Sequence, residues 1–252
     1  MNARRLTRTL AGMAAALAGL PALAQTPSIA SDAWQFEFVP YLWLAGVRSD
    51  LKLGPLPGST VSVSSSSILG ALDFGAMGTL EARKGAWGGL LDLQYVKLGV
   101  GNEFAGGLLG GYDVKFKQTI ATLAGFYRVV DGPASVDVLG GVRYVDANTR
   151  VDIGPSPRGF GRQIEETVGS TDGILGVRAI VPLGDKWSLL GYLDAGHGSA
   201  TSSWQAIAGA SYQYSPTTSL KFGYRYLDYK RDHALLNKAA MGGFYFGAGF
   251  KF

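Results

Sequence analysis

The chain ends in GGFYFGAGFKF, residues 242–252, and this stretch decides the fold. Phe244, Phe246, Phe250 and Phe252 alternate with small or polar residues, which is the period-two pattern of a strand with one apolar face. The terminus of a water-soluble domain is usually frayed and polar. An aromatic face at this position needs a covering surface, and we expect that surface to be lipid.

The same alternation recurs along most of the chain and predicts ten strands. Most of them exceed the five or six residues that are typical of globular sheets, and many reach the roughly 9–11 residues that a tilted strand needs to cross a bilayer. The candidate strands cover residues 34–47, 77–83, 87–98, 112–129, 136–152, 171–183, 187–197, 202–214, 218–229 and 242–252. In 112–129 the alternation does not assign the two faces.

The connections between these strands alternate in length. Tight turns are expected at 83–85, 131–134, 184–186 and 215–218, and longer links at 48–75, 99–111, 151–169 and 230–239, with 196–201 in between. Short periplasmic turns and longer outer loops are typical of an outer-membrane barrel. We therefore predict an all-β, transmembrane antiparallel β-barrel of ten strands with both termini in the periplasm. Eight or twelve strands are the alternatives, because residues 48–75 could contain a further hairpin.

A water-soluble barrel or sandwich would show the same alternation and turns. It would turn a charged face to water, whereas the polar face here is rich in glycine and carries few long charged side chains. That composition favours a narrow lumen, and so a bacterial outer-membrane location.

The first 24 residues have the layout of a secretory signal peptide. Arg4, Arg5 and Arg8 precede an apolar stretch at 10–23, and Ala22-Leu23-Ala24 forms a small-x-small cleavage site. The apolar stretch is shorter than the roughly 20 residues of a spanning helix. We expect cleavage after residue 24, a short lead over 25–33, and the barrel over 34–252.

Charge and cysteine content exclude several classes of protein. Without the three leader arginines, the 23 basic residues fall to 20 against 19 acidic ones, so the charge gives no indication of nucleic-acid binding. The chain has no cysteine, which leaves no disulfide in an exported protein. With no cysteine and only two histidines, His197 and His233, no zinc-binding spacing is present, and we expect neither metal nor cofactor.

Charged residues on the polar face are the candidate site. A lumen with five acids and six bases can cross-link itself by ion pairs, and small barrels are nearly filled by their side chains. The favoured interpretation is a plugged interior held by ion pairs, and the alternative is a narrow polar conduit for ions or small solutes. The residues expected to point inward are Glu37, Glu81, Arg83, Asp92, Asp137, Arg143, Arg178, Asp194, Lys221, Arg225 and Lys251.

A hydrolase at the outer rim is a third, less favoured hypothesis. Asp194, His197 and Ser199 lie close together in the sequence, and these residue types can serve acid–base or nucleophilic catalysis. Asp194 and His197 differ in strand parity, so they would face opposite sides of the sheet. We expect no catalytic residue.

Two stretches resemble a family of uncharacterised proteobacterial outer-membrane β-barrel proteins. FEFVPYLWLAGVRSDLKLG at 36–54 and SSILGALDFGAMGTLEARKGAWGGLLDLQYVKLG at 66–99 carry the Pro-Tyr-Leu-Trp opening, the Leu-Asp-Phe segment and the Glu-Ala-Arg-Lys-Gly turn. The end, YFGAGFKF, resembles the C-terminal assembly signal of such barrels, with Phe246, Phe250 and Phe252. The resemblance implies compartment and architecture, and the barrel assembly machinery as a partner, but no activity.

Outer-membrane lipid and lipopolysaccharide are the other expected partners. Basic residues in the long links could pair with lipopolysaccharide phosphates. Arg158, Arg162, Lys230, Arg231 and Lys238 are the candidates. The expected role is structural, or that of a binding surface presented by the outer loops.

Overall fold

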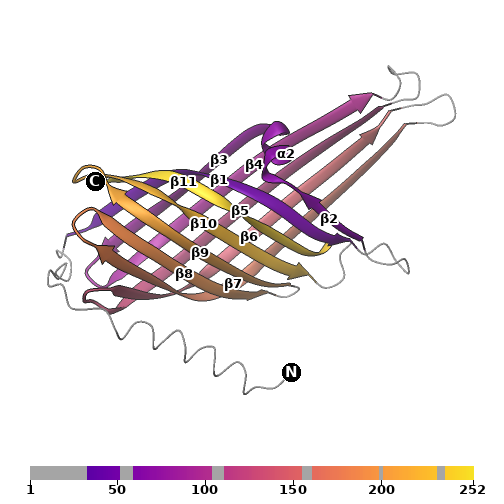
Figure 1. Cartoon of the computed structure of the whole chain (residues 1–252). Helices are drawn as coiled ribbons and strands as arrows, with labels where there is room; N and C mark the ends of the chain where they lie inside the picture. Colours follow the sequence, from indigo (N-terminus) through magenta and orange to yellow (C-terminus); the bar gives the residue numbers. More distant parts are fainter. Residues whose placement is uncertain (1–32, 52–58, 104–110, 155–160, 199–200, 232–235) are drawn as a thin grey trace.

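Ten strands close into one antiparallel barrel in the computed structural model, which describes residues 33–51, 59–103, 111–154, 161–198, 201–231 and 236–252 (Figure 1). Each strand pairs with the next, and the last pairs with the first. The barrel strands are β1 (Gln35–Leu51), β3 (Leu72–Lys84), β4 (Trp87–Glu103), β5 (Gly111–Val130), β6 (Ser135–Ile153), β7 (Arg162–Leu183), β8 (Trp187–Gly198), β9 (Thr201–Gln213), β10 (Thr218–Arg231) and β11 (Leu236–Lys251). The predicted all-β barrel of ten strands is confirmed.

Closure joins the two ends of the chain's described part. The β1–β11 register runs from Glu37 opposite Lys251 to Leu51 opposite Leu236, and the amide of Phe252 donates to the carbonyl of Phe36 at 3.1 Å. A barrel bonds every strand to two neighbours, so it leaves few unpaired backbone groups in hydrocarbon. The C-terminal strand therefore completes the wall.

Between the end of β1 at Leu51 and the start of β3 at Leu72, the described residues form a short strand and a helix rather than another barrel hairpin. β2 (Ser59–Val63) pairs only with β1, where Val63 lies opposite Val47. α2 (Ser65–Gly70) follows, and the Ser64 hydroxyl caps it by accepting from the amide of Ser67. Both elements therefore lie outside the ring of ten.

The two ends of the barrel differ, and we name them the turn end and the loop end. At the turn end the chain reverses within a few residues between β3 and β4, β5 and β6, β7 and β8, and β9 and β10. Gly85 and Gly184 adopt φ values of +59° and +73° in two of these turns, a region that favours glycine. The strand ends near both termini lie here too, and short turns with both termini indicate the periplasmic side.

The predicted long links at 99–111, 151–169 and 230–239 are wrong in part, because strands extend into each of them. β4 continues to Glu103, β6 to Ile153 and β10 to Arg231, while β7 already begins at Arg162. Parts of β4 to β7 run beyond the other strands at the loop end (Figure 1). We call this part, residues 96–103, 111–118, 147–153 and 162–168, the projecting sheet. Alternation continues there with the polar and apolar faces exchanged, and sequence analysis therefore assigned residues 99–103 and 162–168 of this sheet to links.

Apolar side chains cover the outer surface of the barrel wall below the projecting sheet. Leu93, Leu123, Leu175, Phe244 and Phe246 are all exposed and outward-facing. Aromatic side chains lie in pairs near the turn end, as in the girdles that flank a bilayer. The pairs are Trp34–Phe36, Phe36–Phe252, Trp87–Tyr127 and Trp187–Tyr212. Among the described residues no helix is long and apolar enough to cross a membrane. The predicted signal peptide and lead lie outside the described residues, apart from Ala33.

Candidate functional site

Asp137 is the centre of a charge cluster inside the turn end of the barrel. Its carboxylate accepts from Arg83 at 2.9 Å, from Arg128 at 2.9 Å and from Arg178 at 2.8 Å. The Arg178 guanidinium also donates to Glu81 at 2.6 Å. A buried charge is tolerated when it is paired and hydrogen-bonded, and strands β3, β5, β6 and β7 are cross-linked by this cluster.

An aromatic ring supports the same cluster. The guanidinium groups of Arg83 and Arg178 lie 4.9 and 4.5 Å from the ring centroid of Phe126, within cation–π distance. Phe126 belongs to a buried apolar group on the inner face of β4 to β7, which includes Leu90, Ala124, Leu139 and Ile174. This group fills the lumen on that side, so the open space lies toward β8 to β11.

A second pair lies at the turn-end rim. Lys221 donates to Glu37 at 2.7 Å, and both side chains are partly exposed. Lys251 is exposed and donates to the side-chain oxygen of Gln213 at 3.1 Å. It makes no ion pair within 4.0 Å among the described residues.

Asp92 and Asp194 anchor a network that crosses the middle of the lumen, which we call the central network. Asp92 accepts from Tyr41 at 2.6 Å, from Thr79 at 2.9 Å and from Arg225 at 2.8 Å. Arg225 also donates to Gln205 at 2.9 Å, and Gln205 donates to Asp194 at 3.3 Å. Strands from opposite sides of the barrel are thereby connected.

Arg143 and Asp194 form the most deeply buried ion pair. The guanidinium donates to both carboxylate oxygens, one of them at 3.0 Å, and also to Thr122 at 3.3 Å. Arg143 is 0% exposed and Asp194 is 1% exposed. Tyr192 donates a further hydrogen bond to Asp194 at 2.7 Å. The bidentate geometry fixes the relative position of β6 and β8.

Toward the loop end, side chains that are almost wholly apolar close the lumen above the central network. Five buried residues from β1, β5, β6, β10 and β11 pack together, and we call them the apolar layer: Trp43, Ile120, Val145, Leu227 and Met241. The Arg225 guanidinium lies 5.1 Å from the Trp43 ring, so the two layers are in contact. An ion moving between the two ends would lose its hydration at this layer.

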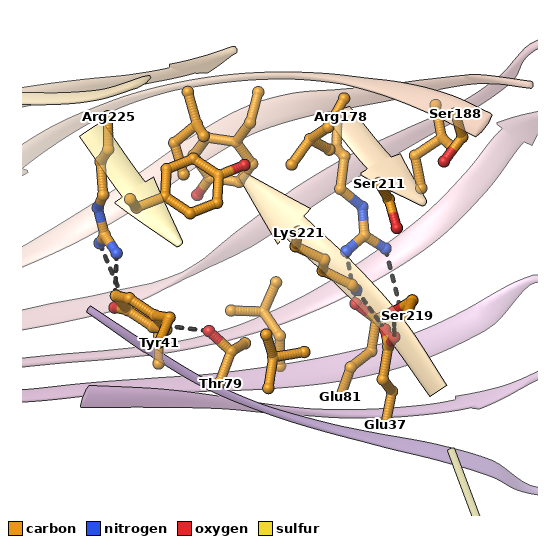
Figure 2. Close-up of a pocket in the computed structure, with 18 of the residues that line it drawn as sticks. Glu37, Tyr41, Thr79, Glu81, Arg178, Ser188, Ser211, Ser219, Lys221 and Arg225 are labelled. Atoms are coloured by element: carbon orange, nitrogen blue, oxygen red, sulfur yellow. Dashed lines mark hydrogen bonds and ion pairs between the residues drawn. The ribbon is translucent and has the colours of Figure 1, made fainter. Parts of the chain in front are cut away.

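A cavity of about 350 Å³ occupies the turn-end half of the lumen. Arg225 and Tyr41 lie at one end of it, and Glu37, Glu81, Arg178 and Lys221 at the other (Figure 2). The cavity reaches rim residues such as Lys251 and Gln213, and it ends at the central network. The lumen is therefore a cup that opens at the turn end.

The structure places ten of the eleven predicted inward residues in ion pairs within the lumen, and Lys251 at its rim. Sequence reasoning missed Arg128, Asp131 and Asp172. Arg128 lies on the strand whose faces were not assigned, and it pairs with Asp131 at 3.5 Å as well as with Asp137. Asp172 shares the parity of Arg178 on β7, and it accepts from Ser203 at 2.7 Å. Asp172 lies inside the predicted strand 171–183, so following the alternation back from Gly176 and Arg178 would have found it.

The rim-hydrolase arrangement does not form. Asp194 is enclosed by Arg143 and Tyr192, whereas His197 is exposed on the opposite face of β8. Ser199 and His233 lie outside the described residues. Nor is there a cluster of three metal-ligating side chains in the part of the chain that the structure describes.

Comparison with known proteins gives similarity of architecture only. No protein-family model matches the chain, and no curated protein matches it. Among solved structures, the translocator domain of the autotransporter NalP from Neisseria meningitidis is 13% identical, with a TM-score of 0.45 over 99% of this chain and 96% of that one. Ail of Yersinia pestis is 15% identical, with a TM-score of 0.34 over 88% and 100%. The CymD monoaromatic hydrocarbon channel is 9% identical, with a TM-score of 0.36 over 88% and 89%.

The closed ring of strands, the apolar outer surface and the ion-paired lumen together identify the compartment. The chain is a bacterial outer-membrane β-barrel. Phe246 and Phe250 lie on its outer surface, and Phe252 is exposed beside Phe36. The resemblance of these phenylalanines to an assembly signal stays a prediction.

Proposed function

We propose that this barrel does not conduct and that its role is structural or that of a binding surface at the loop end. The observation that carries the proposal is the apolar layer packed directly on the central network. A polar network alone could let water pass between its members. A layer of Trp43, Leu227 and Met241 above it offers no hydrogen-bond path, apart from the Trp43 indole, which donates to the Gly243 carbonyl at 3.3 Å.

Planar-bilayer recording of the protein extracted from outer membranes tests this proposal. We expect no steady openings when insertion is verified by protease protection. A Trp43→Ala/Arg225→Ser/Leu227→Ala variant is the positive control, because it removes the bulk of both layers and should conduct. Reproducible openings of the unmodified protein would overturn the proposal and favour the small ion or solute channel.

The projecting sheet supports the binding role. Its outer face carries alternating charges, with Lys115 and Asp113 3.0 Å apart and Arg150 and Asp152 3.1 Å apart. It extends beyond the other strands at the loop end (Figure 1). A partner that approaches from outside would therefore meet this sheet first. We assign no catalytic role to it.

We also propose that lipopolysaccharide phosphates contact Lys97 and Lys117. These two lysines are cross-strand neighbours on the outer face of β4 and β5, just beyond Tyr95. Lys97 also pairs with Asp73 at 3.2 Å. A Lys97→Gln/Lys117→Gln variant should retain less lipopolysaccharide on purification, whereas unchanged retention would contradict the contact. Of the basic residues predicted for this role, Lys230 is exposed, Arg158 lies outside the described residues, and the side chains of Arg162, Arg231 and Lys238 are not described.

A further inference from the structure

The cup at the turn end has the size and lining of a small-molecule site. Pockets of roughly 300–1,000 Å³ with mainly apolar walls and a few convergent polar groups are typical of ligand sites, and this cavity measures about 350 Å³. Its apolar walls come from Val39, Leu90, Ile180, Leu190 and Ile207. Because the central network and the apolar layer close the other end, a ligand would enter from the turn end.

Three hydrogen-bond donors form a row across the cavity wall. Ser188 on β8 lies opposite Ser211 on β9, and Ser211 lies opposite Lys221 on β10. All three line the cavity. The two serine side chains make no hydrogen bond within the described part of the chain. Lys221 gives one N–H to Glu37 and an ammonium has three donors, so two stay available.

Tyr245 adds a hydroxyl next to this row. Gly209 and Gly223 are cross-strand neighbours, and Gly223 lies opposite Tyr245. A Cβ at either glycine would collide with the tyrosine, with its hydroxyl at Gly209 and with its ring at Gly223. The ring therefore lies over Gly209 and Gly223, and its hydroxyl lies at Gly209, two residues from Ser211 on the same face of β9. This hydroxyl has no hydrogen-bond partner among residues 33–252 that the structure describes.

The cavity lining also carries one more cation than anion. Its three acids are Glu37, Glu81 and Asp92, and its four bases are Arg178, Lys221, Arg225 and Lys251. Each acid already has a basic partner, at 2.7, 2.6 and 2.8 Å respectively. Lys251 is the remaining base, at the mouth of the cup. A single negative charge would balance the lining.

We propose that this cup binds a small amphipathic monoanion from the periplasm. Its carboxylate accepts from Ser188, Ser211, Lys221 and Tyr245, and its hydrocarbon part contacts Ile180, Leu190 and Ile207. The surplus cation Lys251 attracts the anion at the mouth of the cup, the unbonded hydroxyls and Lys221 bind its carboxylate, and the apolar walls contact its hydrocarbon part. The inference goes beyond the closed-barrel proposal, and it stands whether or not the loop end conducts.

Saturation-transfer NMR of the full protein in lipid nanodiscs tests the site with hexanoate as the probe. Hexanamide is the neutral isostere, hexylamine is the cationic one, and empty nanodiscs measure partition into lipid. We expect saturable hexanoate binding at least about tenfold tighter than hexanamide binding, the loss typical of one charge-assisted hydrogen bond. Absence of hexanoate binding, equal binding of hexanamide, or preference for hexylamine would each overturn the proposal.

Two variants separate direct contact from net charge. Ser211→Ala removes one donor with the loss of a single heavy atom, and Glu37→Gln/Lys221→Met removes the rim pair without changing the formal charge. Both should weaken hexanoate binding by about tenfold or more. Ser202→Ala and Lys230→Met are the matched controls, because these exposed residues lie on the outer face of the same strands. Heat-modifiable gel mobility verifies that each variant and each control is folded. Unchanged hexanoate affinity in both site variants would show that the row does not bind the anion.

Discussion

The membrane-spanning wall and the projecting sheet are made by the same strands with opposite polarity. On the outer face of β5, Leu123 and Tyr127 are apolar in the wall, and Lys115 and Lys117 replace them in the projecting sheet. On the inner face of β6 the order reverses, from Arg143 in the wall to Val151 in the projecting sheet. Nothing in the backbone changes at the crossover, since the β4–β5 register continues from Trp87 opposite Tyr127 to Glu103 opposite Gly111.

The difference indicates where the solvent changes from lipid to water. A barrel wall in hydrocarbon places apolar side chains outward, whereas a sheet in water places polar side chains on its exposed face. Lys97 and Lys117, opposite each other, mark the first polar level beyond Tyr95. The loop-end boundary of the bilayer therefore lies near this level on β4 and β5.

Breaking the buried ion pair between Arg143 on β6 and Asp194 on β8 should lower the free energy of unfolding the most. Arg143→Met leaves Asp194 charged and enclosed, and removal of one partner of a buried pair costs about 3–5 kcal/mol. The free energy of unfolding in urea is measured in lipid vesicles, with tryptophan fluorescence as the signal. Arg143→Met/Asp194→Asn should recover part of the loss, because no buried charge is left. A single variant as stable as the parent would contradict the role of this pair.

Placing a charged side chain on the lipid-facing surface of the wall should have the next largest effect on the free energy of unfolding. Leu123→Arg places a charge on the lipid face about midway between Tyr127 and Thr119, and such a substitution costs about 2–4 kcal/mol near the bilayer midplane. Lys117→Leu on the same face of β5 is the control, and a surface change of this kind stays within about 0.5 kcal/mol. If the two variants lowered the free energy of unfolding in vesicles equally, the loop-end boundary of the bilayer would lie elsewhere on β5.

The sequence was sufficient to predict the barrel and most of the inward residues. Alternation with period two identifies a face without any knowledge of partners, which is why Arg143, Arg225 and Asp92 were found. It does not reveal which of them meet. Arg143 and Asp194 lie on β6 and β8, with β7 between them, and Gly176 on β7 lies opposite Asp194. Their contact depends on the stagger of the strands, which no local pattern encodes.

Two misses have the same physical origin. Strand 112–129 gave no clear faces because its inner residues Ile120, Ala124 and Phe126 are apolar like its outer ones, so Arg128 was missed. Residues 163–167, within the predicted link at 151–169, were interpreted as a loop because their polar side chains Gln163, Glu165 and Thr167 lie outward once the strands leave the bilayer. In both places the alternation of polarity depends on the environment, and the sequence alone does not indicate that environment.

The smallest effect is expected for the ion pair of β6 that lies in the projecting sheet. Arg150 and Asp152 are 3.1 Å apart, but their side chains are 43% and 35% exposed. Solvent screens such a pair, and exposed pairs contribute about 0–1 kcal/mol. Arg150→Met should therefore lower the free energy of unfolding far less than Arg143→Met does on the same strand, and its effect should shrink further at high salt. A loss as large as that of Arg143→Met would mean that Arg150 is enclosed in the membrane protein, by a partner or by lipid headgroups, and would move the boundary beyond the projecting sheet.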